Sequence, residues 1–218
     1  MYFASRMQAG RMLAAQIVPK YRDQTCAVIG IGDGGVMVGA QIASQLRCVL
    51  TMLLTEEITL PREPVAIGGM LEDGTFVYNP AMSTGELEEM ITEYRGNIEQ
   101  EKLAKLHKMN GLVGSGGLIN RDLLRGHNII LASDGFKDSF ALDMALKYLK
   151  PIKLERVIIA TPLASVRAID RMHVTVDEIN CLTVVENYMD TDHYYDTNDV
   201  PEHQKVIETI EQIVADWR

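Results

Sequence analysis

A glycine-rich segment near the N-terminus has the residue types that bind a phosphate group. Gly30 to Gly35 reads G-x-G-x-x-G and lies between an apolar run and a segment with helical apolar spacing. Glycines at a strand-to-helix turn let a pyrophosphate approach the positive end of the helix. Glu56 or Glu57, about 20 residues later, stands where an acid would bind a ribose hydroxyl. However, Asp33 puts a negative charge in the segment, and glycines also occur at such turns for steric reasons alone.

A second polar segment, Ser133 to Ser139 (SDGFKDS), follows the apolar run HNIILA. Asp134 is expected at the carboxyl edge of a sheet, where α/β proteins bind their ligands. We therefore predict that Asp134 belongs to a ligand-binding site, and metal coordination is one of the roles open to it. Ser133, Asp138 and Ser139 equally suit the N-cap of the next helix, where Asp138 would interact favourably with the macrodipole.

A third segment, residues 189–199 (MDTDHYYDTND), is rich in acids. His193 lies among these acids, which could raise its pKa or bind a hard cation. The segment lacks the regular spacing of a calcium loop, and the histidines of the chain show no HxH or HxxxH spacing. It is therefore predicted to be an acidic loop in solvent.

The elements that must position these segments are read from apolar spacing. Strands are predicted at 25–31, 48–55, 127–133, 155–161 and 179–185, and a hairpin around Asp73-Gly74. Helices are predicted over 4–18, ending before Pro19, and after GDGG, from the capping box Ser83–Glu86, and over 138–149, 163–171 and 206–217. Buried strands that alternate with helices predict an α/β fold, a parallel sheet flanked by helices.

The carboxyl ends of the predicted strands indicate where to search for a site. They are residues 30–35, 55–58, 132–139 and 161–165. We expect one domain over residues 1–218, with a flexible glycine-rich loop at about 110–120 (NGLVGSGGLIN).

Composition excludes several classes of protein. The formal net charge is −9 and the hydrophobic share is 47%, which argues against a nucleic-acid binder, a polybasic membrane binder and a disordered chain. No apolar run approaches the length of a membrane span. The three cysteines lie far apart and are expected to be reduced thiols, so the expected location is the cytoplasm.

Several stretches, in order along nearly the whole chain, resemble a bacterial family of predicted phosphoribosyltransferases of the type I fold. They are RMQAGRMLAAQI (R-x-x-AG-x-x-LA), VIGIGDGGVMVGAQIASQL, EPVAIGGMLEDGTFVYNP, GHNIILASDG and DEINCL. The resemblance implies a five-stranded parallel core with a small hood, a phosphoribosyl diphosphate donor and Mg²⁺. It also implies a reaction in which a nucleophile displaces pyrophosphate from the ribose C1.

The resemblance assigns SDGFKDS to the phosphoribosyl-diphosphate loop, where two acids hold ribose hydroxyls and a Thr-Gly-x-Thr-like turn binds the 5′-phosphate. Ser133 replaces the first acid, Asp134 keeps the second, and Gly135 and Phe136 take variable positions. The turn that binds the 5′-phosphate, here called the cradle, then begins with Lys137, Asp138 and Ser139. Asp138 stands in place of a Thr, and Ser139 in place of a Gly.

In the other two anion-binding loops, an acid stands where the family has a basic residue. Gly32, Asp33, Gly34 and Gly35 form the pyrophosphate loop, and Asp33 replaces an Arg. Thr55-Glu56 replaces an Arg-Lys pair at a strand end. A carboxylate ~4 Å from a phosphate oxygen costs on the order of 1 kcal/mol in water and more where water is excluded.

The leading hypothesis is therefore a phosphoribosyltransferase-like protein with a degenerate donor site. It would be an altered or weak transferase, or a non-catalytic protein that binds a nucleotide or a phosphorylated sugar, with Mg²⁺ where the donor binds. The alternatives are a dinucleotide (NAD-type) binding protein that uses GIGDGG, and a structural or regulatory subunit. Each of these hypotheses is compatible with a homodimer.

Overall fold

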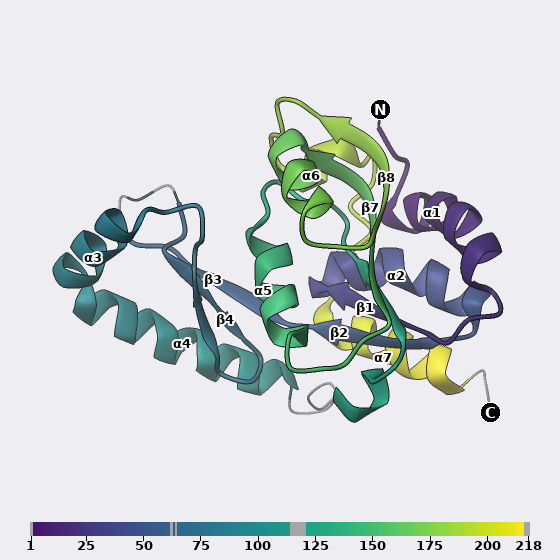
Figure 1. Ribbon diagram of the computed structural model, residues 1–218, viewed down its shortest axis with the longest axis horizontal. Coiled ribbons are helices and arrows are strands. Elements are labelled where there is room, and N and C mark those ends of the chain that lie inside the picture. The colour runs from purple at the N-terminus through teal and green to yellow at the C-terminus, as the bar shows by residue number, and fades with distance from the viewer. Residues whose placement is uncertain (1, 62, 64, 114–120, 216–218) are drawn as a thin grey trace. The chain divides into compact units, whose positions relative to one another are not determined.

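The computed structural model describes residues 2–61, 63, 65–113 and 121–215 (Figure 1). They form two compact units, each with its own sheet. The larger unit contains residues 1–52, 119–139 and 151–218, and the smaller unit contains residues 53–118 and 140–150. That the whole chain behaves as one domain stays a prediction.

The larger unit is built on a five-stranded sheet with the order β2-β1-β6-β7-β8. Its strands are β1 (Cys26–Ile31), β2 (Val49–Leu53), β6 (Asn128–Ala132), β7 (Arg156–Ser165) and β8 (Glu178–Val185). The pairs β1–β6, β6–β7 and β7–β8 are parallel. All residues of β1 and β6 are buried, as expected for central strands covered on both faces.

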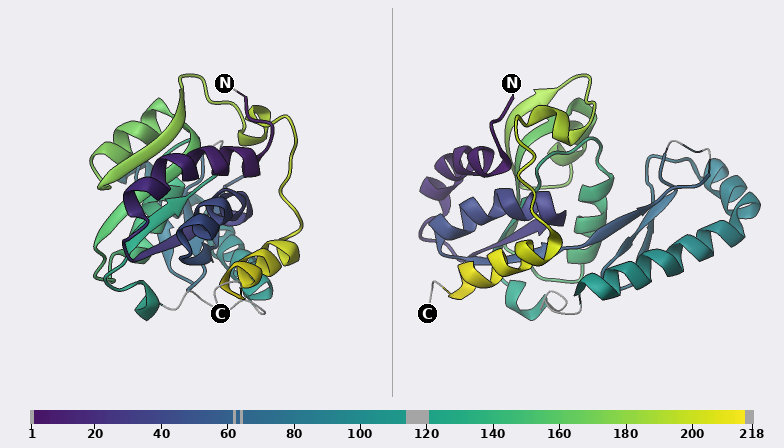
Figure 2. Two further views of the ribbon diagram at one scale, coloured as in Figure 1. Left: turned by 90° about the vertical axis from the view of Figure 1, so that its right-hand side faces the viewer. Right: turned by 180° about the vertical axis from the view of Figure 1, so that it is seen from behind.

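Helices cover both faces of this sheet. The helices of the larger unit are α1 (Arg6–Tyr21), α2 (Gly32–Leu46), α6 (Val166–His173) and α7 (His203–Ala215), with the 3₁₀ helices η1 (Arg121–Leu124) and η2 (Thr191–Tyr194). Figures 1 and 2 show α1 and α2 on one face and α6 on the other. The predicted fold class, a parallel sheet flanked by helices, is confirmed.

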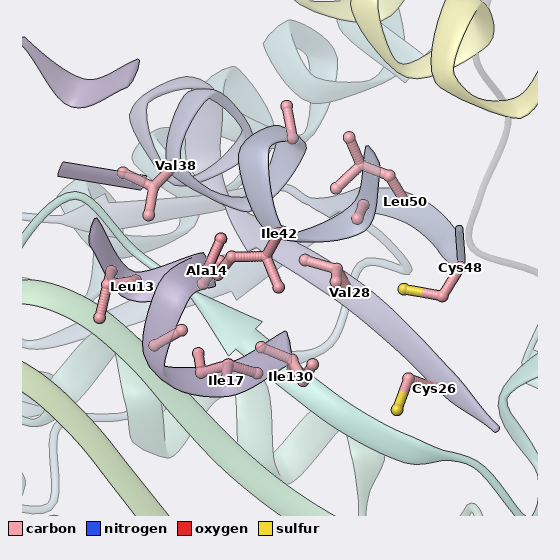
Figure 3. Packing of buried hydrophobic residues seen from close by; sticks show 14 of the residues in the cluster. Leu13, Ala14, Ile17, Cys26, Val28, Val38, Ile42, Cys48, Leu50 and Ile130 are labelled. Carbon is pink, nitrogen blue, oxygen red and sulfur yellow. The ribbon is translucent and has the colours of Figure 1, made fainter. Parts of the chain in front are cut away.

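The core of the larger unit lies between the sheet and the helices α1, α2 and α7 (Figure 3). Leu13 and Ile17 of α1 meet Ile42 of α2 above Val28 and Ile130 of the two central strands. Each of these five side chains is fully buried. Burying one such side chain stabilises a fold by about 1.5–3 kcal/mol. This layer therefore holds in place β1 and β6, whose carboxyl ends carry the candidate site.

The smaller unit has a three-stranded antiparallel sheet with the order β3-β4-β5. Its elements are β3 (Thr55–Ile58), β4 (Gly68–Leu71), β5 (Phe76–Tyr78), α3 (Thr84–Glu93), α4 (Arg95–Val113) and α5 (Phe140–Leu149). The predicted hairpin is present as β4 and β5. Only Gly74 in its turn has a positive φ, +81°, so the turn is not the type I′ turn that Asp-Gly favours.

The capping box that opens α3 forms as predicted. Ser83 accepts a hydrogen bond from the Glu86 amide, and the Glu86 carboxylate accepts one from the Ser83 amide at 2.8 Å. The helix ends at Glu93, and α4 begins at Arg95.

Four other expectations at the level of single elements are wrong. α1 continues through Pro19 to Tyr21, because a proline in the last turn removes few bonds while Ile17, Val18 and Tyr21 of the same helix are buried. The predicted strand 48–55 divides at Leu54 into β2 and β3. β7 extends to Ser165, so the helix expected from residue 163 begins later. Residues 110–113 of the expected flexible loop belong to α4, and residues 114–120 lie outside the described residues.

In the described part of the chain, no helix is both long and apolar enough to cross a membrane.

Candidate functional site

The two predicted phosphate-binding segments lie together at the carboxyl edge of the larger sheet. Gly32–Gly35 follows β1 and Ser133–Ser139 follows β6, and these strands are neighbours, with Gly30 opposite Ala132. The strand order reverses between them, because β2 lies on one side of β1 and β6, β7 and β8 lie on the other. This is the topological switch point where open α/β sheets bind ligands.

The carboxylate of Asp134 forms a buried ion pair with Arg6. Nε of Arg6 donates to Oδ2 of Asp134 at 2.7 Å, and the two side chains are 2% and 19% exposed. The backbone oxygen of Asp134 accepts a hydrogen bond from the Tyr195 hydroxyl. Burial raises the pKa of the Asp134 carboxyl, and the Arg6 guanidinium opposes that rise. The carboxylate predicted to bind ribose or a metal is thus bound by the protein itself.

The other two nitrogens of Arg6 are also in use. Nη1 donates to Oδ1 of Asn198 at 2.9 Å, and Nη2 donates to Asp192. The guanidinium carbon lies 4.4 Å from the centroid of the Tyr195 ring, a cation–π contact. Burial lowers the pKa of Arg6, but the carboxylates of Asp134 and Asp192 raise it above its ordinary value. The cation is therefore fixed, and each of its three nitrogens already donates to a side chain of the protein.

The glycines of the first segment are explained by the packing of the chain on itself. Gly32 has φ +65°, a conformation that side chains disfavour, and α2 begins at this residue. GDGG is therefore the first turn of α2 and not a separate loop. A methyl group on Gly34 would overlap the Asp134 carboxylate, so the two segments touch at this glycine.

Asp33, in the first turn of α2, is paired with His203 at the start of α7. Oδ1 of Asp33 lies 2.7 Å from Nδ1 of His203. Nε2 of His203 is buried and has no hydrogen-bond partner among the described residues. The acid in place of the family's Arg thus has an internal partner too.

The rest of the second segment uses its backbone internally. The Ser133 hydroxyl bonds to both the N–H and the C=O of Gly135, at 3.2 and 3.1 Å, so it does not cap the following helix. The amide of Phe136 donates to Leu163 at 3.1 Å. Lys137 and Asp138 are exposed and Ser139 is half-buried. Lys137 is the cation of this segment that can reach a ligand.

Thr55 and Glu56 do not end a strand of the large sheet. They belong to β3 of the smaller unit, where Glu56 pairs with Met70 of β4. Lys105 and Lys108 of α4 bind the Glu56 carboxylate, the first at 3.0 Å. Burial opposes ionisation of Glu56, but the two lysines lower its pKa below the ordinary value. The predicted strand-end position is therefore wrong, because the strand divides at Leu54.

Sequence reasoning missed the residues that surround Asp134. Arg6 is the first residue of the R-x-x-A-G pattern, which was the signal available for it. Asp192, Tyr195 and Asn198 lie in the segment predicted to be an acidic loop in solvent. Asp192 is 53% exposed, but Tyr195 is only 6% exposed, so that prediction is wrong for the centre of the segment.

A metal site does not emerge from the described residues. They contain no group of three or more His, Cys, Asp or Glu side chains arranged to hold an ion. Asp134, the predicted ligand, has a guanidinium where a cation would bind. The residues present therefore do not fit a metal that the protein alone would hold.

Comparison with curated proteins finds relatives in sequence. A "putative phosphoribosyl transferase" of Mycobacterium tuberculosis, from strains CDC 1551 and H37Rv, is 25% identical over 181 residues, or 83% of this chain. The chain spans about 40% of the length of that relative. No family model matches the chain.

Comparison with solved structures finds the same fold. The crystal structure of TT1426 from Thermus thermophilus aligns over 100% of this chain and 99% of its own, with a TM-score of 0.68 and 24% identity. AQ2163 from Aquifex aeolicus aligns over 89% of this chain and 86% of its own, with a TM-score of 0.51 and 11% identity. The resemblance predicted from the sequence is confirmed: this chain is a relative of proteins described as phosphoribosyl transferases and has an α/β fold with a parallel sheet flanked by helices.

Proposed function

We propose that this chain is a phosphoribosyltransferase-like protein with a degenerate donor site. It binds a nucleotide or a phosphorylated sugar at the switch point, and it transfers phosphoribosyl groups slowly or not at all. The observation that carries the proposal is the buried ion pair between Asp134 and Arg6. A donor ribose would have to compete with a guanidinium for the one ribose-binding acid that the loop retains.

The charges around the switch point support weak binding of a donor with several phosphates. Asp33 and Asp138 occupy the two segments that would receive the pyrophosphate and the 5′-phosphate. Lys137, next to Asp138 in sequence, is a cation that would attract a phosphate here, and His203, the partner of Asp33, adds a positive charge only when it is protonated. Since each uncompensated carboxylate costs on the order of 1 kcal/mol or more beside a phosphate, a ligand with one phosphate is favoured over one with three.

The place of Mg²⁺ follows from the same geometry. Because Asp134 is bound by Arg6, we expect no Mg²⁺ site in the free protein. The ion would arrive with a donor that carries its own phosphate oxygens, which are ligands of the kind Mg²⁺ prefers.

Isothermal titration calorimetry tests the proposal. Phosphoribosyl diphosphate with Mg²⁺, ribose 5-phosphate and nucleoside monophosphates are titrated separately into the protein. We expect a dissociation constant for the donor weaker than ~100 μM, an affinity of about 5.5 kcal/mol, and tighter binding of a monophosphate. Donor binding below that value would overturn the degenerate site.

A triple substitution tests whether the loop itself limits donor binding. Ser133→Asp, Asp138→Thr and Ser139→Gly together give the loop two acids and a neutral cradle. We expect part of the donor affinity to return. Lys150→Thr, a change at an exposed residue outside the loop, is the control. Equal donor binding by the triple variant and the wild type would show that the loop is not the limiting defect.

The dinucleotide alternative has one observation in its favour. The strand β1 passes directly into α2 through Gly32, the context that a G-x-G-x-x-G motif requires. Against it, Gly34 has a packing role beside Asp134, and the Glu56 carboxylate is bound by two lysines. NAD is therefore included in the same titration, and binding tighter than that of the monophosphates would favour this alternative.

A further inference from the structure

The strap, residues 188–203, connects β8 to α7 and contains η2. In the left view of Figure 2 it runs as a yellow-green trace from the end of β8 to α7. Its two ends contact different segments of the candidate site, and its centre contacts the N-terminal segment. These contacts do not depend on any resemblance to another protein.

Residues 188–195 of the strap contact the start of the segment after β6, at Asp134 and Gly135. The Tyr195 hydroxyl donates to the backbone oxygen of Asp134. A methyl group on Gly135 would overlap the Tyr188 hydroxyl and would lie 3.0 Å from Cγ2 of Thr191. The Tyr188 hydroxyl is itself bonded to Thr191 at 3.0 Å. A ligand that approached Gly135 from this side would meet the strap first.

The last residue of the strap contacts the segment after β1. His203 lies 2.7 Å from Asp33, beside the first turn of α2. The strap therefore reaches both segments of the switch point, although their sequences are about 100 residues apart.

Arg6 and the N-terminal segment hold the centre of the strap. Arg6 binds Asp192 and Asn198 through its two terminal nitrogens. The amide of Asp196 donates to Phe3 at 2.8 Å, and the amide of Phe3 donates to Tyr194 at 2.9 Å. These bonds fix the strap at several points in the closed position.

The strap also has the features of a segment that can open locally. Asp192 is 53% exposed, and Asn198 is exposed as well. The strap side chains that are deeply buried are Tyr194 and Tyr195, which pack in a cluster with Phe3, Ala9 and Leu163. Segments with few deeply buried side chains open at a lower free-energy cost than the core of a domain.

We propose that the strap is a cover over the switch point and that a ligand enters only when this cover opens. The hydrogen bonds from Arg6 to Asp192 and Asn198 hold the cover closed, and we call them the latch. The inference rests on the proposed function for the identity of the ligand, a phosphorylated sugar or a nucleotide. The cover itself is a property of the free protein. If the closed form predominates, the observed affinity is reduced by the fraction of molecules that are open.

A matched pair of variants tests the latch. Asp192→Ala removes one acceptor of Arg6, and Asp196→Ala removes the same charge from an exposed strap residue that bonds through its backbone. Because both variants change the net charge equally, a general electrostatic gain in anion binding is the same in each. Tyr195→Phe, which removes only the hydroxyl, serves as a second loosened variant if Asp192→Ala folds poorly.

Hydrogen exchange read by mass spectrometry gives the result without a ligand. In Asp192→Ala we expect exchange to become faster both in the strap and in residues 133–136, with no change in Asp196→Ala. Calorimetry with ribose 5-phosphate and with adenosine monophosphate gives the second readout. We expect affinity about tenfold higher in Asp192→Ala than in Asp196→Ala, since a larger open fraction raises the observed affinity in proportion.

The outcomes separate the cover from the proposed function. Faster exchange in the strap with unchanged exchange in residues 133–136 overturns the cover. Coupled exchange with equal affinities in the two alanine variants overturns the latch as a control of entry. Coupled exchange with no binding of either ligand by any variant supports the cover and overturns the proposed ligand class.

Discussion

Two clusters of charge, one in each unit, bind an acid that the sequence singled out for a ligand. At the switch point of the larger unit, Asp134 meets Arg6, whose side chain is 2% exposed. In the smaller unit, Glu56 meets Lys105 and Lys108, which are 28% and 57% exposed. The two acids are about equally exposed, at 19% and 18%, so the burial of the cation is what separates the two arrangements.

The difference shows how the contribution of an ion pair to stability depends on its burial. A buried charge without a partner costs several kcal/mol, so the pair between Arg6 and Asp134 is a condition for the fold around it. A pair near solvent contributes little, because water and salt already stabilise its charges. A carboxylate paired with a cation is therefore a structural element at the switch point and an adjustable contact in the smaller unit.

The largest expected effect comes from Arg6→Ala. The change leaves Asp134 buried without its cation, and we expect a loss of about 3–5 kcal/mol in the free energy of unfolding. Urea unfolding followed by circular dichroism measures it. Arg11→Ala, at an exposed residue of the same helix, is the control and is expected to change stability by less than about 0.5 kcal/mol.

Removal of both charges sharpens the same test. Arg6→Ala combined with Asp134→Ala should be more stable than Arg6→Ala alone, because no buried charge is left unpaired. Equal stability of Arg6→Ala and Arg11→Ala would show that the cluster is not a condition for the fold.

Gly34→Ala is expected to have the next largest effect. Its methyl group would overlap the Asp134 carboxylate, which must move away from Arg6, at a cost of about 1–3 kcal/mol. Gly96→Ala in α4 meets no atom within 4 Å and should stabilise the helix by about 0.5–1 kcal/mol. Thermal unfolding measures the shift in melting temperature that each variant causes. Shifts of the same sign in the two variants would contradict the close contact at Gly34.

Glu56→Gln tests the cluster of the smaller unit. We expect a loss of about 0.5–1 kcal/mol at pH 7, since the contact is partly exposed. Because the two lysines lower the folded-state pKa of Glu56 below the ordinary 4.5, its contribution is present above about pH 4.5 and disappears as the pH falls through the lowered value. Urea unfolding of wild type and variant at pH 7 and pH 3 measures the difference, which should shrink at pH 3. A difference that is equal at both values contradicts the assignment, and Glu99→Gln, whose carboxylate is 63% exposed, is the control.

Salt should give the smallest effect and the clearest contrast. Between 0.1 and 1 M NaCl the screening length falls from about 10 Å to about 3 Å. The loss caused by Glu56→Gln should decrease toward zero, a change of less than about 1 kcal/mol. The loss caused by Arg6→Ala should stay nearly constant, because the guanidinium is buried and salt screens buried pairs much less. Equal salt dependence of the two losses would show that both pairs are equally accessible to solvent.

The sequence predicted the fold well where the signal was local. The apolar runs that became β1 and β6 are buried throughout, and the capping box at Ser83 formed as expected. The errors fall where a local rule met a tertiary preference. Pro19 did not end α1, because Ile17, Val18 and Tyr21 on the same helix are buried, and the apolar run from Cys48 to Thr55 was divided between two sheets.

The sequence also placed the candidate site in the right region but did not identify the partners of its residues. Asp134 does lie at the carboxyl edge of the sheet, next to Gly34, as the order of the elements requires. The guanidinium that binds it belongs to a residue 128 positions away. Nothing in the spacing of the acids in residues 189–199 indicated that Tyr195 would be buried against this pair.

The amino-acid pattern alone therefore indicates which segments form strands and helices, and that two polar segments follow strands of the sheet. These properties follow from apolar periodicity and from turn residues, which act over a few positions along the chain. The pairing of Asp134, Asp33 and Glu56 with a cationic or histidine side chain of the same chain becomes visible only in the folded protein. The physical reason is that a buried charge must find a partner, and which partner it finds depends on the segments that folding brings together, however far apart they lie in sequence.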